Sequence, residues 1–354
     1  MTFRGSLLSL VALCAAPFHH DRAAAQSMTD PTAQTRTVPA RTLPVPSTVS
    51  PQMAKIIARP PTAPTAPRTA QEWKTVVRAA ADREAEPIAA AIRQFAVTVE
   101  PVRIAGIPCF TITPANVSAR NAHRVLLHLH GGAYVFAPGR SGTLEGIVMA
   151  GFSGMKVISV DYRMPPDHPF PAAMDDAVAV WKELTRREKP ANMAVFGSST
   201  GGGMTLALVQ SAQKLGLPLP AAIAPGTPWS DLTNTGDSYF TNEGVDNGLV
   251  SYEPLLSAAA RLYANGVALK DPRLSPVYGN FKGFPPTILT TGTRDLFLSN
   301  TVRVHRKLRE AGVDSRLEVY EGQSHGQYLA DPTAPESKEA FEDIASFFDA
   351  HLGT

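Results

Sequence analysis

Between residues 125 and 351, short apolar runs alternate with segments of helical periodicity. The apolar runs occupy 125–129, 157–160, 193–196, 221–224, 288–291 and 317–320, and the helical segments occupy 173–185, 202–215, 300–311 and 337–351. Strands that are apolar along their whole length are typical of a parallel sheet buried on both faces, with helices as the cover. The pattern therefore predicts an α/β fold with a mostly parallel sheet. Two earlier segments, 97–99 and 109–112, are expected to add antiparallel edge strands.

The N-terminal part of the chain does not share this alternation. Residues 1–25 combine a basic start, an apolar stretch at 7–18 that is too short to span a bilayer, and alanines at 23–25, which is the pattern of a cleaved signal peptide. Residues 26–70 are rich in proline, threonine and alanine and are expected to form an extended leader or linker, with order only where it meets the domain. The folded domain is therefore expected to cover 71–354 of a periplasmic or secreted protein, and no other segment suggests a membrane span.

Charge and cysteine content exclude several classes of function. The 33 basic and 31 acidic residues give a net charge of +2 with no cluster of either sign, so a nucleic-acid partner is not expected. The two cysteines are too few for a cysteine-based zinc site or a disulfide scaffold. A hydrolytic metal motif would need Asp and His after His128-x-His130, where Gly132 and Ala133 stand instead. We therefore expect no metal and no organic cofactor, and the sequence carries no signal for an oligomeric state.

The segment 193–203 has the pattern of a nucleophile elbow. An apolar strand runs directly into Gly-Ser-Ser-Thr-Gly at 197–201, and a helical segment follows at once. Such a Gly-x-Ser-x-Gly turn is so tight that it needs small residues around the serine, and it presents the Ser199 hydroxyl at a helix N-terminus. A phosphate-binding loop would need a Lys after the glycines, and a dinucleotide-binding turn would need a different glycine spacing. A purely structural tight turn is the remaining alternative.

A second glycine turn follows the apolar strand at 125–129. In acyl transfer, glycines allow backbone N–H groups to approach the oxyanion of the tetrahedral intermediate closely. We expect these donors to come from Gly131, Gly132 and Thr200, with Ala133 as a further candidate. The alternative is a plain glycine turn after a strand.

A serine nucleophile needs a general base and an acid that orients the base. His325 falls in a loop just after the last apolar strand, whereas the other late histidines lie in helical segments. Asp295 ends the preceding apolar strand, and the order Ser199, Asp295, His325 is the order that accompanies a strand–elbow–helix nucleophile. The alternative acids, at the two ends of the last strand, are Asp314 and Glu321.

With these motifs in register, residues 95–351 resemble the hormone-sensitive-lipase-like family of α/β-hydrolases, a family of esterases and lipases. The block at 161–173 is similar to that family's Asp-Tyr-Arg-Leu-Ala-Pro-Glu motif. The resemblance implies the α/β-hydrolase fold, with an eight-stranded, mostly parallel sheet, helices on both faces and a helical cap from about 71–95 and 233–270. The subgroup that looks most similar is the monoterpene ε-lactone hydrolases.

The chain departs from the family pattern beside the predicted nucleophile and in the second glycine turn. Ser198 and Thr200 flank the nucleophile where the family usually has Asp and Ala. Thr200 keeps its backbone N–H but places a β-branched side chain beside the oxyanion. Ala133 replaces the third glycine of the family's His-Gly-Gly-Gly motif.

We therefore expect a serine carboxylester hydrolase that acts on esters or lactones of small to medium apolar acids through an acyl-enzyme. Tyr134, Trp229 and Tyr328 flank the predicted loops and are expected to contact the substrate, although packing in the cap is the commoner fate of such aromatic residues. An amidase or a narrow lactonase would use the same residues. A non-catalytic binding protein, similar to the plant hormone receptors that resemble this family, would lack the histidine, so the presence of His325 favours the enzyme.

Overall fold

The computed structural model describes residues 37–62 and 65–353. Residues 45–354 form one compact unit, and residues 37–44, which carry no regular secondary structure, lie outside that unit. The predicted signal peptide at 1–25 lies outside the described residues, so export stays a prediction. None of the described helices is long and apolar enough to cross a membrane.

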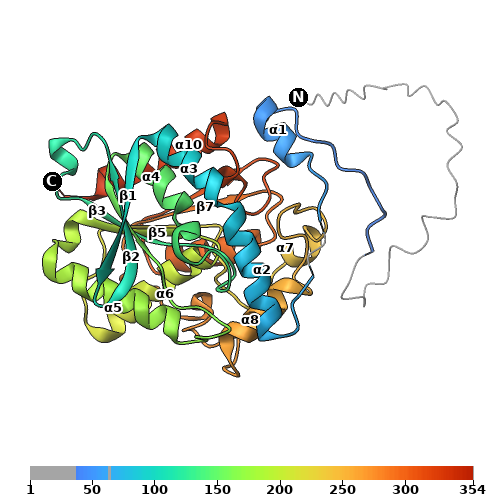
Figure 1. The fold of residues 1–354 in the computed structure, drawn as a ribbon. Helices are drawn as coiled ribbons and strands as arrows, with labels where there is room; N and C mark the ends of the chain where they lie inside the picture. The colour runs from blue at the N-terminus through green and yellow to red at the C-terminus, as the bar shows by residue number, and fades with distance from the viewer. Residues whose placement is uncertain (1–36, 63–64, 354) are drawn as a thin grey trace, which may run out of the picture. The chain divides into compact units, whose positions relative to one another are not determined.

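An eight-stranded sheet forms the centre of the unit (Figure 1). The strands are β1 (Val97–Ile104), β2 (Ile107–Pro114), β3 (Val125–Leu129), β4 (Lys156–Val160), β5 (Met193–Ser198), β6 (Ala222–Gly226), β7 (Thr287–Gly292) and β8 (Ser315–Tyr320). Their order across the sheet is β1-β2-β4-β3-β5-β6-β7-β8, with antiparallel pairing of β1 with β2 and of β2 with β4 and parallel pairing elsewhere. The predicted α/β-hydrolase fold is confirmed. Only β1 of the expected edge pair is an edge strand, since β2 pairs on both sides.

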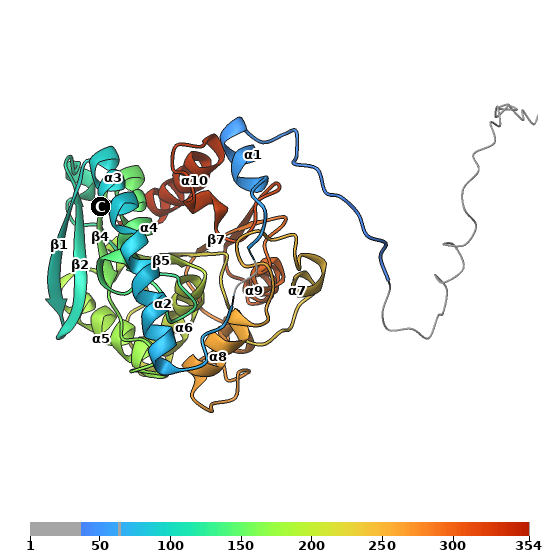
Figure 2. The ribbon, with the colours of Figure 1, turned by 45° about the vertical axis from the view of Figure 1, so that its right-hand side comes forward.

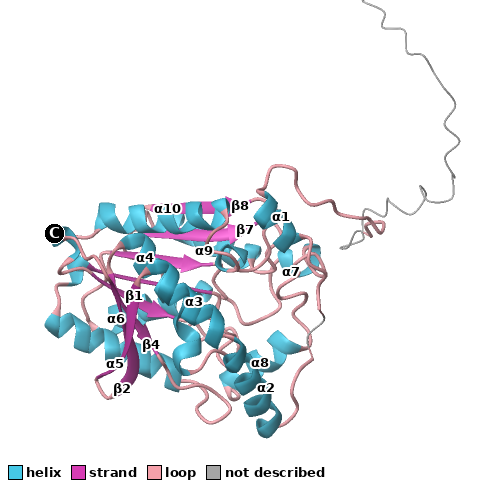
Figure 3. Ribbon diagram, turned by 45° about the horizontal axis from the view of Figure 1, so that its top comes forward, coloured by secondary structure: helices cyan, strands magenta, loops and turns pink. Residues whose placement is uncertain are grey.

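Helices cover both faces of this sheet (Figure 3). One face carries α3 (Ala85–Phe95), α4 (Leu144–Ser153) and α10 (Pro335–His351), and the other carries α5 (Ala172–Arg187), α6 (Thr200–Leu215) and α9 (Leu298–Glu310). Successive side chains of a strand point to opposite faces, so Leu126 enters one apolar core and Leu127 the other. The central strands are therefore apolar throughout, as the sequence pattern required.

Two segments far apart in the sequence lie side by side above the carboxyl ends of the strands. They are α2 (Ala70–Arg83) and α8 (Leu255–Ala264), and the views in Figures 1 and 2 agree on their proximity. The short helix α7 (Ser238–Thr241) also belongs to the 233–270 insertion. The expected helical region 71–95 is divided at Glu84, and Pro87 lies in the first turn of α3, where no backbone N–H is needed for a helical hydrogen bond.

The proline-rich leader contains a helix that its composition does not suggest. Helix α1 (Pro51–Ile57) begins after Ser50, whose hydroxyl accepts a hydrogen bond from the Met53 amide, and proline occupies the first helical position. Its apolar residues Met53, Ile56 and Ile57 are buried in a small cluster with Ala334. The Ser-Pro start with apolar residues at helical spacing is the signal for this helix, and the leader is ordered at 51–57, where it contacts the domain.

Candidate active site

The turn from β5 to α6 places Ser199 in a strained backbone conformation. Its φ of 61° and ψ of −123° are rare for a residue with a side chain, and α6 begins at the next residue. The glycines on either side are sterically required, because a Cβ on Gly197 or Gly201 would lie 1.9 Å from the carbonyl oxygen of Leu129. The strand, the tight turn and the helix therefore form the elbow that the sequence predicts, and Ser199 lines a cavity.

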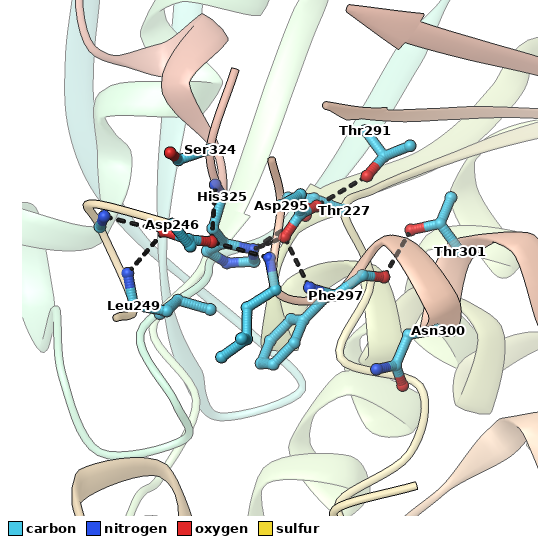
Figure 4. A network of polar contacts seen from close by, with 12 residues as sticks. Thr227, Asp246, Leu249, Thr291, Asp295, Phe297, Asn300, Thr301, Ser324 and His325 are labelled. Carbon is cyan, nitrogen blue, oxygen red and sulfur yellow. Dashed lines mark hydrogen bonds and ion pairs between the residues drawn. The ribbon is translucent and has the colours of Figure 1, made fainter. Parts of the chain in front are cut away.

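The structure brings Asp295 and His325 together. Asp295 follows β7, His325 follows β8, and their Oδ1 and Nδ1 atoms are 3.0 Å apart (Figure 4). Asp295 is fully buried, and its carboxylate also accepts hydrogen bonds from the Phe297 amide and the Thr291 hydroxyl, each at 2.7 Å. A carboxylate held by these donors is fixed in position and can hold the imidazole with Nδ1 protonated. Within the described part of the chain, the alternative acids have other partners, since Asp314 lies 3.7 Å from Nε2 of His351 and Glu321 accepts a hydrogen bond from the Thr48 hydroxyl.

A third side chain in this contact, Thr227, was not predicted. Its hydroxyl lies 2.8 Å from Nδ1 of His325 and donates a short hydrogen bond to the carboxylate of Asp295. Thr227 follows β6, the strand next to β7, so the sheet order brings it to the site. No motif marks this residue, because its role depends on the neighbouring strand and not on its own sequence context.

His325 and Ser199 line the same cavity, which has a volume of about 480 Å³. Gly131 and Gly132 from the loop after β3 line it as well. Within the described residues, the amides of these two glycines donate to no other protein group, and the Thr200 amide lies in the first turn of α6, where helical amides have no partner. Gly131 and Gly132 therefore line the same cavity as the predicted nucleophile, and Thr200 is the next residue in the chain after it; that their amides form an oxyanion hole stays a prediction. Gly132 is required as glycine, because its φ is +115° and a Cβ would lie 2.7 Å from the Phe136 carbonyl oxygen.

The preceding histidine supports this glycine loop from within the protein. His130 is buried and stacks on Tyr162 with ring centroids 4.1 Å apart. Its Nδ1 lies 2.7 Å from the Gly131 carbonyl, and the Tyr162 hydroxyl donates to the His130 carbonyl at 2.7 Å. Burial lowers the pKa of His130 to about 4, so the ring is neutral at pH 7 and acts as a packing and hydrogen-bonding group. Among the described residues, no three His, Cys, Asp or Glu side chains lie close enough together to bind a metal ion.

The structure corrects the predicted substrate contacts. Tyr134 stacks on Tyr263 with ring centroids 3.6 Å apart, and Trp229 stacks on Phe297 at 5.4 Å. Tyr328 is also buried, and its hydroxyl lies 2.5 Å from Ser198 Oγ. None of the three predicted aromatic residues lines the cavity, because all three pack into the core beneath the site. The cavity wall instead consists largely of smaller apolar side chains and one phenyl ring: Ala80, Ala81, Ala133, Phe136, Ala137, Leu144, Leu249, Leu255, Leu256 and Leu329.

A carboxylate from α4 lies directly beside the elbow. Glu145 accepts hydrogen bonds from the amide and the hydroxyl of Ser198 at 3.1 and 2.5 Å, and its Oε2 is 3.2 Å from Nε2 of His128. The chain therefore has an acid near the nucleophile although its elbow contains Ser198 in place of Asp. Glu145 lies far from residue 198 in the sequence, so only the packing of α4 against the sheet reveals this contact.

Comparisons with known proteins agree with this geometry. A family model for the alpha/beta hydrolase fold matches residues 126–329. The chain is 30% identical to an esterase of Acinetobacter venetianus over 71% of this chain and 82% of the relative, and 30% identical to an acetyl-hydrolase of Streptomyces hygroscopicus over 66% and 78%. The crystal structure of an esterase named E25 superposes with a TM-score of 0.87 at 43% identity, covering 91% of this chain and all of that one.

A second solved structure connects the chain to a named branch of this fold. The crystal structure of an esterase from the bacterial hormone-sensitive lipase family has a TM-score of 0.69 at 28% identity, covering 81% of this chain and all of that one. The chain therefore belongs to the α/β-hydrolase family, in its hormone-sensitive-lipase-like branch, and is a serine carboxylic ester hydrolase.

Proposed function

We propose that the chain hydrolyses esters or lactones of small to medium apolar acids through an acyl-enzyme on Ser199. The observation that carries the proposal is the bonded pair of Asp295 and His325 on the same cavity as the strained Ser199. Gly131, Gly132 and Thr200 supply the amides of the oxyanion hole. These residues need no metal ion or organic cofactor for the reaction.

The reaction begins with proton transfer from Ser199 to Nε2 of His325 as the serine oxygen attacks the ester carbonyl. Asp295 holds Nδ1 and stabilises the imidazolium that forms, without accepting its proton. The carbonyl oxygen becomes an oxyanion, which the amides of the glycine loop and of the α6 N-terminus bind more tightly than the neutral carbonyl. His325 then protonates the leaving alcohol. Water repeats these steps on the acyl-enzyme and releases the acid.

The lining of the cavity supports the proposed substrate class. The apolar part of its wall consists of alanine and leucine side chains and the Phe136 ring. A volume of about 480 Å³ lies in the lower half of the range usual for small-molecule sites, which suits short and medium acyl chains. A lactone presents the same carbonyl to Ser199 and is included for that reason.

Labelling with a fluorophosphonate tests the proposed nucleophile. Wild-type protein is expected to react once per chain at Ser199 and to hydrolyse p-nitrophenyl butyrate, because both reactions need the activated hydroxyl. Ser199→Ala is expected to lose the label and to lose at least about 10⁴-fold in kcat. Circular dichroism would verify that the variant is folded. A folded wild type without labelling, or a Ser199→Ala variant labelled to the same extent, contradicts the proposal.

The charge of the cavity predicts discrimination between neutral and anionic esters. Glu84 from the cap and Glu145 beside the elbow line the cavity, and no lysine or arginine lines it in the described part of the chain. An acyl group that ends in a carboxylate would enter a field of like charge, so p-nitrophenyl hemisuccinate is expected to have a kcat/KM at least about tenfold below that of p-nitrophenyl butyrate, or about 1.4 kcal/mol. Glu84→Gln should bring the kcat/KM values of the two esters closer together, because it removes one of the two negative charges. Equal kcat/KM values for the two esters would show that these carboxylates do not set the preference.

A further inference from the structure

The insertion at 233–270 contributes a buried acid to the catalytic loops. Asp246 is fully buried between α7 and α8, and its carboxylate accepts four backbone hydrogen bonds. Building on the proposed function, we propose that Asp246 is a positioning residue for the catalytic pair. Its hydrogen bonds connect the loops of Asp295 and His325 to the cap, and its carboxylate places a second negative charge near the His325 imidazole.

The two oxygens of Asp246 face different parts of the site (Figure 4). Oδ2 accepts the amide of Leu296 at 2.8 Å and the amide of His325 at 3.1 Å. One of these amides belongs to the residue after the catalytic acid, and the other belongs to the catalytic histidine itself. A single oxygen therefore joins two loops that leave different strands of the sheet.

The other oxygen holds the wall of the cavity. Oδ1 of Asp246 accepts the amides of Gly248 and Leu249 at 2.8 and 2.9 Å, and the Leu249 side chain lines the cavity. The next residue, Asn247, continues the connection, since its amide donates to Ser324 Oγ beside the histidine. The cap wall and the catalytic loops are thus bonded to the same short segment of the insertion.

The arrangement favours the ionised form of Asp246. Four amide donors surround the carboxylate, so a proton on either oxygen would have no acceptor and would displace an amide hydrogen bond. Burial and then the charge of Asp295 raise the pKa of Asp246, while His325 and the amides oppose that shift. No lysine or arginine forms an ion pair with Asp246 among the residues described. Its charge is therefore compensated by the amides and by the imidazolium that forms during catalysis.

The groups that face the imidazole are mostly anionic or neutral. Asp295 contacts the ring, Asp246 contacts the backbone of His325, and Thr227 and Ser199 are neutral hydroxyls. Glu84 and Glu145 are the carboxylates on the cavity wall. Removing the charge of Asp246 makes the protonated imidazole less favourable. The acid limb of the pH profile, which reports protonation of the base, then moves to lower pH.

Asp246→Asn tests the proposal, because the amide is nearly isosteric but presents an NH2 group to two of the backbone donors. We measure kcat/KM against pH with p-nitrophenyl butyrate, and we count active sites by fluorophosphonate titration. We expect a loss of about 10- to 100-fold per active site, since displacements of about 1 Å reach that size. We also expect the acid limb to move down by about 0.5 pH unit or more. A purely structural role would lower the number of active sites without moving the profile.

Asp231→Asn is the matched control. Asp231 is also fully buried, but its carboxylate binds Arg303 and the Tyr278 hydroxyl, each at 2.7 Å, and the amide and hydroxyl of Thr233, and not the catalytic loops. This variant is expected to be less stable with an unchanged pH profile per active site. Asp246→Glu separates charge from geometry, because it keeps the charge and should lower the rate without moving the acid limb.

The result that overturns the proposal is an Asp246→Asn variant with the wild-type rate per active site and the wild-type pH profile. If that variant does not fold, an Asp246→Glu variant with a wild-type rate per active site overturns it equally. Wild-type protein that is not labelled at Ser199 would contradict the proposed function itself, so the two failures are distinguishable.

Discussion

Replacing His325 with alanine is expected to lower kcat/KM for p-nitrophenyl butyrate by about 10⁴-fold or more. Among the described residues on the cavity wall, His325 is the only titratable base in contact with a buried carboxylate. Its Nδ1 lies 3.0 Å from Asp295 Oδ1. His130 cannot replace it, because burial lowers the pKa of that ring to about 4 and its Nδ1 already contacts the Gly131 carbonyl. Asp295→Asn should lose a comparable factor of about 10⁴, since it disturbs the tautomer and removes the charge that stabilises the imidazolium.

Steady-state kinetics and the rate of fluorophosphonate labelling measure this loss. His305→Ala is the control, because His305 lies on α9 with Nδ1 2.8 Å from Ser315 Oγ and does not line the cavity. Its kinetics should match wild type. A His325→Ala variant that keeps more than about a tenth of wild-type activity would show that another group serves as the base.

The parts of the site that could be predicted are those that local sequence determines. Ser199 is predictable because an elbow needs a strand, a glycine-flanked serine and a helix in immediate succession. The proximity of Asp295 and His325 is predictable because parallel strands bring their carboxyl ends to one edge of a sheet, so the loops after the last two strands meet there. The order of the three residues along the chain completed the prediction.

The remaining site residues depend on contacts between distant segments. Thr227, Glu145 and Asp246 each form hydrogen bonds with residues far away in the sequence, and no local pattern distinguishes them from other polar residues. The predicted contacts of Tyr134 and Trp229 were wrong for a related reason. An aromatic residue near a catalytic loop has the same sequence signature whether its ring faces the cavity or the core, and the backbone direction of each loop decides between the two.

The fold, too, contains parts that local sequence predicts and parts that it does not. The alternation of apolar runs and helical segments predicts the sheet, because strands that are covered on both faces are apolar along their whole length. The break between α2 and α3 and the helix α1 were harder to predict, because they depend on a single residue at a helix end and on burial against a distant segment. Composition alone suggested an extended leader, and the docking of three apolar side chains outweighed it at 51–57.

Gly201→Ala is expected to have the largest effect on the elbow itself. Gly201 lies at the second position of α6, so helix propensity alone would favour alanine by up to about 1 kcal/mol. A Cβ at this position would, however, lie 1.9 Å from the Leu129 carbonyl oxygen and 3.0 Å from the carbonyl carbon of His130. Both of these atoms are backbone, so no side chain can rotate away. The overlap would have to be relieved by separating α6 from β3, at a cost of about 3 kcal/mol or more, and the steric effect outweighs the propensity.

The same displacement would affect catalysis, because β3 leads into the loop of Gly131 and Gly132 while α6 carries the Thr200 amide. Separating the two elements separates the donors of the oxyanion hole, and the loss of one such donor lowers kcat by about 10²–10³.

Gly106→Ala is the control, since its φ is +80° but no atom lies within 4 Å of the added Cβ. That variant should lose about 1–2 kcal/mol of stability from the left-handed backbone alone, with full activity per active site. Thermal unfolding and titrated kcat values compare the two variants. Equal stability and equal kcat of Gly201→Ala and Gly106→Ala would contradict this prediction. The elbow would then tolerate a side chain at residue 201, and the close approach of α6 to Leu129 would not determine the position of the oxyanion-hole donors.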